Sequence, residues 1–149
     1  MILNLIVISD EKLKEIGKYI STYDSDFLEI LCMNYTLPEW FLHKYRKNLD
    51  WRSLCKFQDL SEKFIREHSD YLDWNYISNS HKLSIEFMTE FKDNLIWEYI
   101  TRYNVLNKEI IQEFYDNLDL ELLKQRNAIE EFITEEELES LIIMKKLIE

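Results

Sequence analysis

The hydrophobic and polar positions between residues 37 and 128 recur with a period of 23 residues. Four consecutive repeats each begin with leucine and carry another leucine at the thirteenth position: 37–59, 60–82, 83–105 and 106–128. Three of them place a tryptophan at the fifteenth position, as Trp51, Trp74 and Trp97. Identical slots are typical of stacked repeats, in which each repeat buries its apolar face against a neighbour. We therefore expect these three indoles to be shielded by the adjoining repeat.

Each repeat contains two helix-start signals. Ser61, Ser84 and Asn107 stand at the second position, where a side-chain oxygen can accept a hydrogen bond from a free backbone N–H. A second start follows at Asp50 and at the equivalent aspartates of two other repeats, and helices this short need packing to be stable. The pattern predicts an all-α fold: an array of about ten short antiparallel helices built from helix-turn-helix repeats, either solenoid-like or a compact bundle.

Two repeats depart from this pattern. Pro38 occupies the first cap position of the first repeat, so we expect Thr36 or Leu37 to cap that helix. Ile96 replaces the cap aspartate of the third repeat, which predicts a more continuous pair of helices there.

The two ends complete a single domain, 1–149. Residues 1–36 resemble a divergent N-terminal repeat with Ser9 and Asp26 as helix caps, and the pattern leaves open whether residues 1–7 extend the first helix or pair as a strand. Residues 129–149 predict an acidic C-terminal capping helix from about Glu135, opened by a capping box of Thr134 and Glu137.

Composition and charge exclude several classes of function. The net charge of −11 repels a phosphate backbone, which argues against direct nucleic-acid binding, although the first repeat alone is net basic. No apolar run is long enough for a membrane span and no secretory signal opens the chain, so we expect a cytoplasmic protein without membrane contact. Cys32 and Cys55 lack metal-binding spacing and predict two reduced thiols.

Enzyme signatures are absent from the sequence. With Gly17 as the single glycine, the chain has no glycine-rich phosphate loop, and it lacks a nucleophile elbow and an HExxH motif. No histidine pair has metal-ligand spacing. The repeat positions place His68 in the core, His81 in a polar loop and His43 on a solvated face. We therefore expect no enzyme activity, no cofactor and no metal.

The segments LSEKFI (60–65), LSIEF (83–87) and LDWNYIS (72–78) carry a family resemblance. They resemble the short tryptophan-containing helical repeats, of the form LSxxFIxxFxxxLDWxxIS, found in proteins of large DNA viruses and bacteriophages. The resemblance covers residues 37–128 and implies a helical fold. By analogy with virus-encoded proteins of this size, it also implies an inhibitor that occludes a host defence protein in the host cytoplasm.

Trp40 is the aromatic residue that the repeat does not explain. Its counterparts Lys63, Glu86 and Glu109 are charged, so the same helix face should be exposed to solvent. An aromatic side chain among cations is a plausible hot spot for an acidic protein surface. The residues predicted to bind a partner are Trp40, His43, Lys44, Arg46, Lys47, Arg52 and Lys56. In the alternative, Trp40 packs on the N-terminal repeat and lysine stems cover it.

Two functions follow from these features. The first is a non-enzymatic helical repeat module that binds and inhibits a protein partner. The alternative is an acidic mimic of nucleic acid that blocks a basic groove, with carboxylates from the C-terminal end: Glu130, Glu131, Glu135, Glu136, Glu137 and Glu139. A solvated helix face with acidic residues near its N-terminus explains the same carboxylates without a partner. The sequence leaves the partner and the oligomeric state open.

Overall fold

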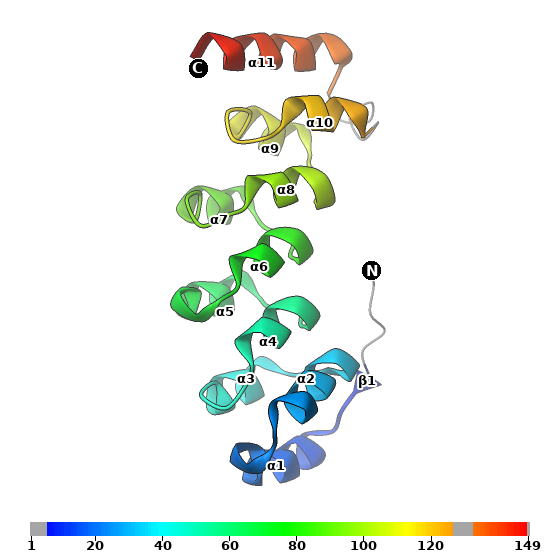
Figure 1. Cartoon of the computed structure of the whole chain (residues 1–149), viewed down its shortest axis with the longest axis vertical. Coiled ribbons are helices and arrows are strands. Elements are labelled where there is room, and N and C mark those ends of the chain that lie inside the picture. Colours follow the sequence, from blue (N-terminus) through cyan, green and yellow to red (C-terminus); the bar gives the residue numbers. More distant parts are fainter. Residues whose placement is uncertain (1–5, 127–132, 149) are drawn as a thin grey trace. The chain divides into compact units, whose positions relative to one another are not determined.

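The protein is all-α, as the sequence predicts (Figure 1). The computed structural model describes residues 6–126 and 133–148, and within them it has eleven α-helices, two short 3-10 turns and one pair of two-residue strands. No helix in these residues is long and apolar enough to cross a lipid bilayer.

The chain divides after Ile77 into two compact parts. The first part contains β1 (Ile6–Val7), α1 (Asp10–Lys18), η1 (Ile20–Thr22), α2 (Ser25–Asn34), β2 (Tyr35–Thr36), α3 (Glu39–Tyr45), α4 (Trp51–Phe57), α5 (Glu62–Glu67) and η2 (Ser69–Tyr71). The division falls inside α6 (Trp74–Ser80). The second part contains α7 (Ile85–Glu90), α8 (Trp97–Tyr103), α9 (Lys108–Glu113), α10 (Leu120–Gln125) and α11 (Glu135–Ile148).

Helices begin at intervals of 23 residues. The helices α3, α5, α7 and α9 begin at residues 39, 62, 85 and 108, and α4, α6, α8 and α10 begin at residues 51, 74, 97 and 120. Ser61, Ser84 and Asn107 each accept a hydrogen bond from the backbone N–H three residues later. Asp50 and Asp119 do the same for α4 and α10. The predicted caps are confirmed at these five positions.

The start of α3 differs from the prediction. Its N-cap residue is Pro38, and no side chain accepts a hydrogen bond there. Proline restricts φ to about −65°, and the observed φ of −67° with ψ of 148° is the extended geometry that opens a helix. The Pro38 carbonyl accepts from the N–H groups of Phe41 and Leu42. The expectation that Thr36 or Leu37 caps this helix is therefore wrong.

Two other predicted helix starts are also wrong. Ile96 does not join α7 to α8, because its backbone is extended and its N–H donates to Ser78 Oγ at 2.9 Å. The cap of α2 is Asp24, whose Oδ1 accepts from Phe27 N at 2.9 Å, and Asp26 lies in the first turn. The N-terminal segment contains extra residues, so its alignment with the later repeats is displaced by two positions.

Both ends of the described chain are tied to the nearest helices. β1 pairs with β2 in parallel, with Ile6 opposite Tyr35, so residues 6 and 7 form a strand rather than the start of α1. At the other end, Thr134 N donates to Glu137 Oε2 at 3.0 Å and Glu137 N donates to Thr134 Oγ1 at 3.2 Å. The predicted capping box is confirmed, and α11 begins at the predicted residue.

The recurring tryptophans are partly shielded, as predicted. Trp51, Trp74 and Trp97 are half-buried. The Trp51 ring stacks on Tyr71 with centroids 5.4 Å apart, and the Trp97 ring centroid lies 4.9 Å from that of Phe114. Each of these two contacts joins a tryptophan to an aromatic side chain of the next repeat.

Buried hydroxyl groups link successive repeats. Ser78 Oγ accepts from Ile96 N at 2.9 Å, and Thr101 Oγ1 accepts from Asp119 N at 3.2 Å. Both hydroxyl-bearing residues are fully buried, and both pairs are separated by 18 residues. A buried N–H without an acceptor costs about 1–3 kcal/mol, so these bonds position the start of each second helix.

Cys32 and Cys55 occupy the same repeat position as Ser78 and Thr101. Both are fully buried and neither forms a disulfide. Burial raises the pKa of Cys32 to about 12 and that of Cys55 to about 11, so both remain protonated at neutral pH. Because the thiolate is the reactive form, these residues serve packing rather than catalysis.

Gly17 provides the contact between α1 and α3. A Cβ atom added at this position would overlap the ring and hydroxyl of Tyr45. Gly17→Ala is therefore expected to lower the free energy of unfolding by about 1–2 kcal/mol, because the cost of overpacking exceeds the gain in helix propensity. Urea denaturation measures this change. Lys14→Ala, at an exposed position of the same helix, is the control and should shift stability by less than about 0.5 kcal/mol. A Gly17→Ala protein as stable as the control would contradict the close packing of α1 on Tyr45.

Candidate functional site

Trp40 lies at the surface of α3. Its side chain is 37% exposed, whereas the other three tryptophans are half-buried. The equivalent residues Lys63, Glu86 and Glu109 are also exposed. The same helix face is therefore solvated in all four repeats, and in the first repeat it presents an indole edge-on to Phe41, with ring centroids 5.7 Å apart.

The cations near Trp40 have no carboxylate partner. Lys44, Arg46 and Lys47 are exposed, and none forms an ion pair within the part of the chain that the structure describes. Lys44 Nζ lies 5.1 Å from the Tyr45 ring centroid, and Arg46 Nη1 donates to the His43 carbonyl at 2.8 Å. Positive charge therefore remains uncompensated here, in a protein of net charge −11.

A second pair of cations lies on α4, one helical turn apart. Arg52 and Lys56 are exposed, and neither is ion-paired to a described residue. The Arg52 guanidinium lies 5.9 Å from the Tyr76 ring centroid, and a hydrogen bond to Tyr76 raises the pKa of Arg52. Lys56 Nζ lies 4.7 Å from the Phe57 ring centroid. We call the combined set of predicted residues without His43 the basic-aromatic surface: Trp40, Lys44, Arg46, Lys47, Arg52 and Lys56.

His43 does not belong to this surface. It is half-buried, and its ring centroid lies 4.9 Å from that of Phe64. Its Nδ1 lies 3.2 Å from His68 Nε2, and its Nε2 lies 3.7 Å from Glu67 Oε2. The prediction of a solvated His43 is wrong, because this position of α3 faces the next repeat rather than solvent.

The three histidines test the repeat alignment. His68 is buried as predicted, and desolvation, followed by the nearby His43, lowers its pKa. His81 is only 4% exposed, so its assignment to a polar loop is wrong. Its counterpart Asn104 is also drawn inward, since its Nδ2 donates to the Ser78 carbonyl at 2.6 Å. This repeat position therefore holds inward-facing polar side chains rather than solvated ones.

Sequence spacing missed the grouping of His43, Glu67 and His68. Each offers one potential metal-ligand atom, and these atoms lie within 4.8 Å of one another. The residues come from adjacent repeats, 24 and 25 positions apart, which matches no single-helix metal motif. Their positions within the 23-residue repeat are the seventh, eighth and ninth, so comparing neighbouring positions in consecutive repeats was the signal that could have found them.

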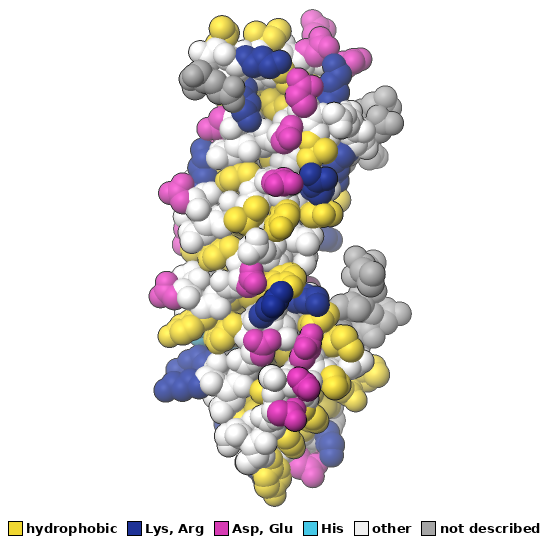
Figure 2. Space-filling model, viewed as in Figure 1, with side chains coloured by type: hydrophobic (Ala, Val, Ile, Leu, Met, Phe, Trp, Pro, Cys, Tyr) yellow, Lys and Arg dark blue, Asp and Glu magenta, His cyan; other side chains and the backbone are white. Residues whose placement is uncertain are grey.

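The acidic C-terminal end is largely paired with lysines. Glu135 and Glu139 lie 3.5 Å and 3.0 Å from Lys124 Nζ, and Glu137 lies 2.5 Å from Lys108 Nζ. The hydrogen bond from Lys108 lowers the pKa of Glu137. Figure 2 shows acidic and basic side chains next to one another at this end of the chain. Glu136 is exposed, and Glu130 and Glu131 lie outside the described residues.

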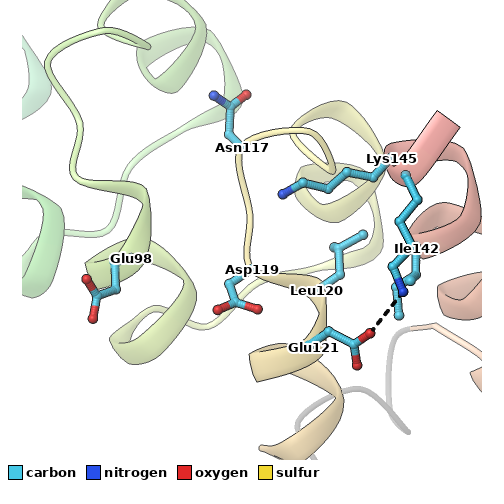
Figure 3. A pocket seen from close by; sticks show the side chains of 8 residues that line it. Glu98, Asn117, Asp119, Leu120, Glu121, Ile142 and Lys145 are labelled. Carbon is cyan, nitrogen blue, oxygen red and sulfur yellow. Dashed lines mark ion pairs between the residues drawn. The ribbon is translucent and has the colours of Figure 1, made fainter. Parts of the chain in front are cut away.

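The second part contains a cleft of about 490 Å³ (Figure 3). Its lining comes from α8, from α10 and the loop before it, and from α11: Glu98, Asn117, Asp119, Leu120, Glu121, Ile142, Lys145 and Lys146. Lys145 Nζ donates to the Leu118 carbonyl at 2.9 Å, and Lys146 lies 3.7 Å from Glu121. Among these described lining residues there is no histidine, cysteine or serine. The cleft therefore offers no nucleophile with a neighbouring base.

Comparison of the chain with protein-family models, with curated proteins and with solved structures found no match. The resemblance of residues 37–128 to viral tryptophan-containing repeats therefore stays a prediction. The functional inference depends on the side chains of the chain itself.

Proposed function

We propose that this chain is a non-enzymatic helical module that binds an acidic surface of a protein partner through its basic-aromatic surface. The observation that supports this proposal is the exposed indole of Trp40, at a helix position where the other repeats expose charged side chains. A tryptophan at a solvated position contributes nothing to the shared repeat packing. It offers a large, rigid contact area, which is why tryptophan is enriched among the residues that dominate binding energy.

Charge adds selectivity for an acidic partner. The cations of the basic-aromatic surface have no carboxylate partner among the described residues, whereas lysines such as Lys12, Lys108 and Lys124 are ion-paired. Binding an acidic surface would pair the free cations without first breaking an internal ion pair. Complementary charge also raises the association rate and disfavours basic partners.

The partner class follows from the resemblance to repeats of large DNA viruses and bacteriophages. A module of this size without a catalytic site would act by occlusion, and a host defence protein is the partner that such an origin favours. The acidic-mimic alternative is weakened because Glu135, Glu137 and Glu139 are paired with lysines, which reduces the negative charge available to a basic groove.

Substitution at the basic-aromatic surface tests the proposal. Trp40→Ala should weaken partner binding about 30-fold, which corresponds to the loss of about 2 kcal/mol expected for a hot-spot tryptophan. The double variant Lys44→Glu, Lys47→Glu should weaken binding about tenfold or more, because like charges then face each other. The partner is isolated by affinity capture on the immobilised wild-type chain, and its affinity for each variant is measured by biolayer interferometry.

Two control variants make the result specific. Glu109→Ala changes the residue equivalent to Trp40 in the fourth repeat and should leave affinity unchanged. Glu136→Lys removes an exposed carboxylate of the acidic end and should also have no effect. Equal affinity of Trp40→Ala and wild type would remove the proposed site, and a large loss in Glu136→Lys alone would favour the acidic mimic.

A further inference from the structure

The closest grouping of metal-ligating side chains in the first part joins the first two full repeats. His43 lies in the last turn of α3, Glu67 is the last residue of α5, and His68 follows directly as its C-cap. His43 Nδ1 and His68 Nε2 are 3.2 Å apart, and Glu67 Oε2 lies 3.7 Å from His43 Nε2. One donor atom from each of the three residues lies within 4.8 Å of the others.

We propose that His43, His68 and Glu67 form a binding site for a divalent transition-metal ion of the zinc class. Two nitrogens on a tetrahedral zinc ion, each about 2.0–2.1 Å from the metal, lie about 3.3 Å apart. The observed 3.2 Å between the two imidazoles matches this separation. Two imidazoles and one carboxylate also form a ligand set that suits Zn²⁺ better than Mg²⁺ or Ca²⁺, which prefer oxygen ligands.

The surroundings hold the two imidazoles and leave the carboxylate free to adjust. The His68 ring is buried, with its centroid 4.5 Å from that of Phe64 and 5.2 Å from that of Trp51. Glu67 is about half exposed at its side chain and reaches Lys63 only at 3.9 Å. Rotation of this side chain brings its oxygen to the metal, and the solvent side of the site leaves a fourth position for water. Packing that fixes ligand orientation is a general feature of metal sites.

A hydrogen bond is the competing explanation for the 3.2 Å contact. One imidazole would donate its N–H to the lone pair of the other, and Glu67 would remain a surface carboxylate. This arrangement binds no ion, so metal binding by the full chain distinguishes the two explanations. A bound ion would cross-link α3 to the end of α5 and stabilise the folded chain by mass action.

Isothermal titration calorimetry of the full-length chain with Zn²⁺ tests the site directly. The wild type should bind one equivalent, and Co²⁺ should give the visible absorption bands of a tetrahedral site. His68→Phe should weaken Zn²⁺ binding about 100-fold or more, since the loss of an outer-shell partner alone costs 10–100-fold. The substitution preserves packing because Phe91 and Phe114 occupy the equivalent position. His43→Gln, which introduces the residue type found at the equivalent Gln112, should have a similar effect.

A matched control separates the site from general histidine binding. His81→Asn removes the third histidine and places there the residue found at Asn104, so one equivalent of Zn²⁺ should still bind with unchanged affinity. Far-ultraviolet circular dichroism confirms that each variant is folded. Absence of one-to-one binding by the folded wild type, or equal Zn²⁺ affinity of wild type and His68→Phe, would overturn the proposal and leave the hydrogen bond alone.

Discussion

Phe64→Ala is expected to lower the free energy of unfolding by about 3–5 kcal/mol. Phe64 is fully buried, and its ring lies 4.9 Å from the His43 ring and 6.1 Å from the Trp51 ring between centroids. Truncation removes the apolar area and leaves a cavity that the short surrounding helices can fill only in part. Because small domains are stable by about 5–15 kcal/mol, this loss should be visible as a large shift of the urea midpoint.

The fourth repeat supplies the matched control for this experiment. Ile110 occupies the position of Phe64, so Phe64→Ile keeps a large apolar side chain that the repeat already tolerates. It should cost about 1–1.5 kcal/mol, because part of the volume is retained. If the alanine variant lost no more stability than the isoleucine variant, Phe64 would not be the centre of this core.

The fold was largely predictable because each repeat carries its helix starts in its own sequence. Ser61, Asp50 and Asn107 cap helices at the expected positions, and these are local effects that involve residues only three apart. The errors arose where the chain departs from the repeat. Pro38 and Ile96 have no side-chain acceptor, so their helix starts depend on backbone geometry and, for Ile96, on a hydroxyl 18 residues away.

The candidate site was predictable only in part, for a related reason. The position of Trp40 could be compared with Lys63, Glu86 and Glu109, which revealed an exposed helix face. His43 could not be placed in this way, because its environment is set by His68 on the neighbouring repeat. Residues that meet across repeats are separated by 18 to 26 positions in this chain, so motif spacing along one helix does not detect them.

These contacts between repeats also explain why polar residues recur in buried positions. Ser78 and Thr101 accept a backbone N–H from the next repeat, while Gln58 and Asn104 each donate to a backbone carbonyl 26 residues earlier. Short helices leave many backbone groups without an intrahelical partner. The side chains at these two repeat positions satisfy some of those groups, and they do so in both parts of the chain.

Gln58→Leu is the substitution that tests this role most strongly, with an expected loss of about 2–4 kcal/mol in the free energy of unfolding. Gln58 is 5% exposed and makes three hydrogen bonds to backbone groups. Its Oε1 accepts from Leu37 N at 2.8 Å, and its Nε2 donates to the carbonyls of Cys32 at 2.6 Å and Tyr35 at 2.9 Å. Leucine keeps much of the volume but leaves these groups unpaired, and urea denaturation measures the resulting loss.

Gln58→Asn separates hydrogen bonding from packing at this position. Asn104 shows that asparagine can reach the carbonyl 26 residues earlier, so Gln58→Asn should keep the bond to Cys32 and lose those to Leu37 and Tyr35. Its stability should fall between those of wild type and Gln58→Leu. Hydrogen exchange at the Leu37 amide should accelerate in both variants, because both lose its acceptor. Slow exchange at Leu37 together with unchanged stability in Gln58→Leu would show that other acceptors replace this side chain.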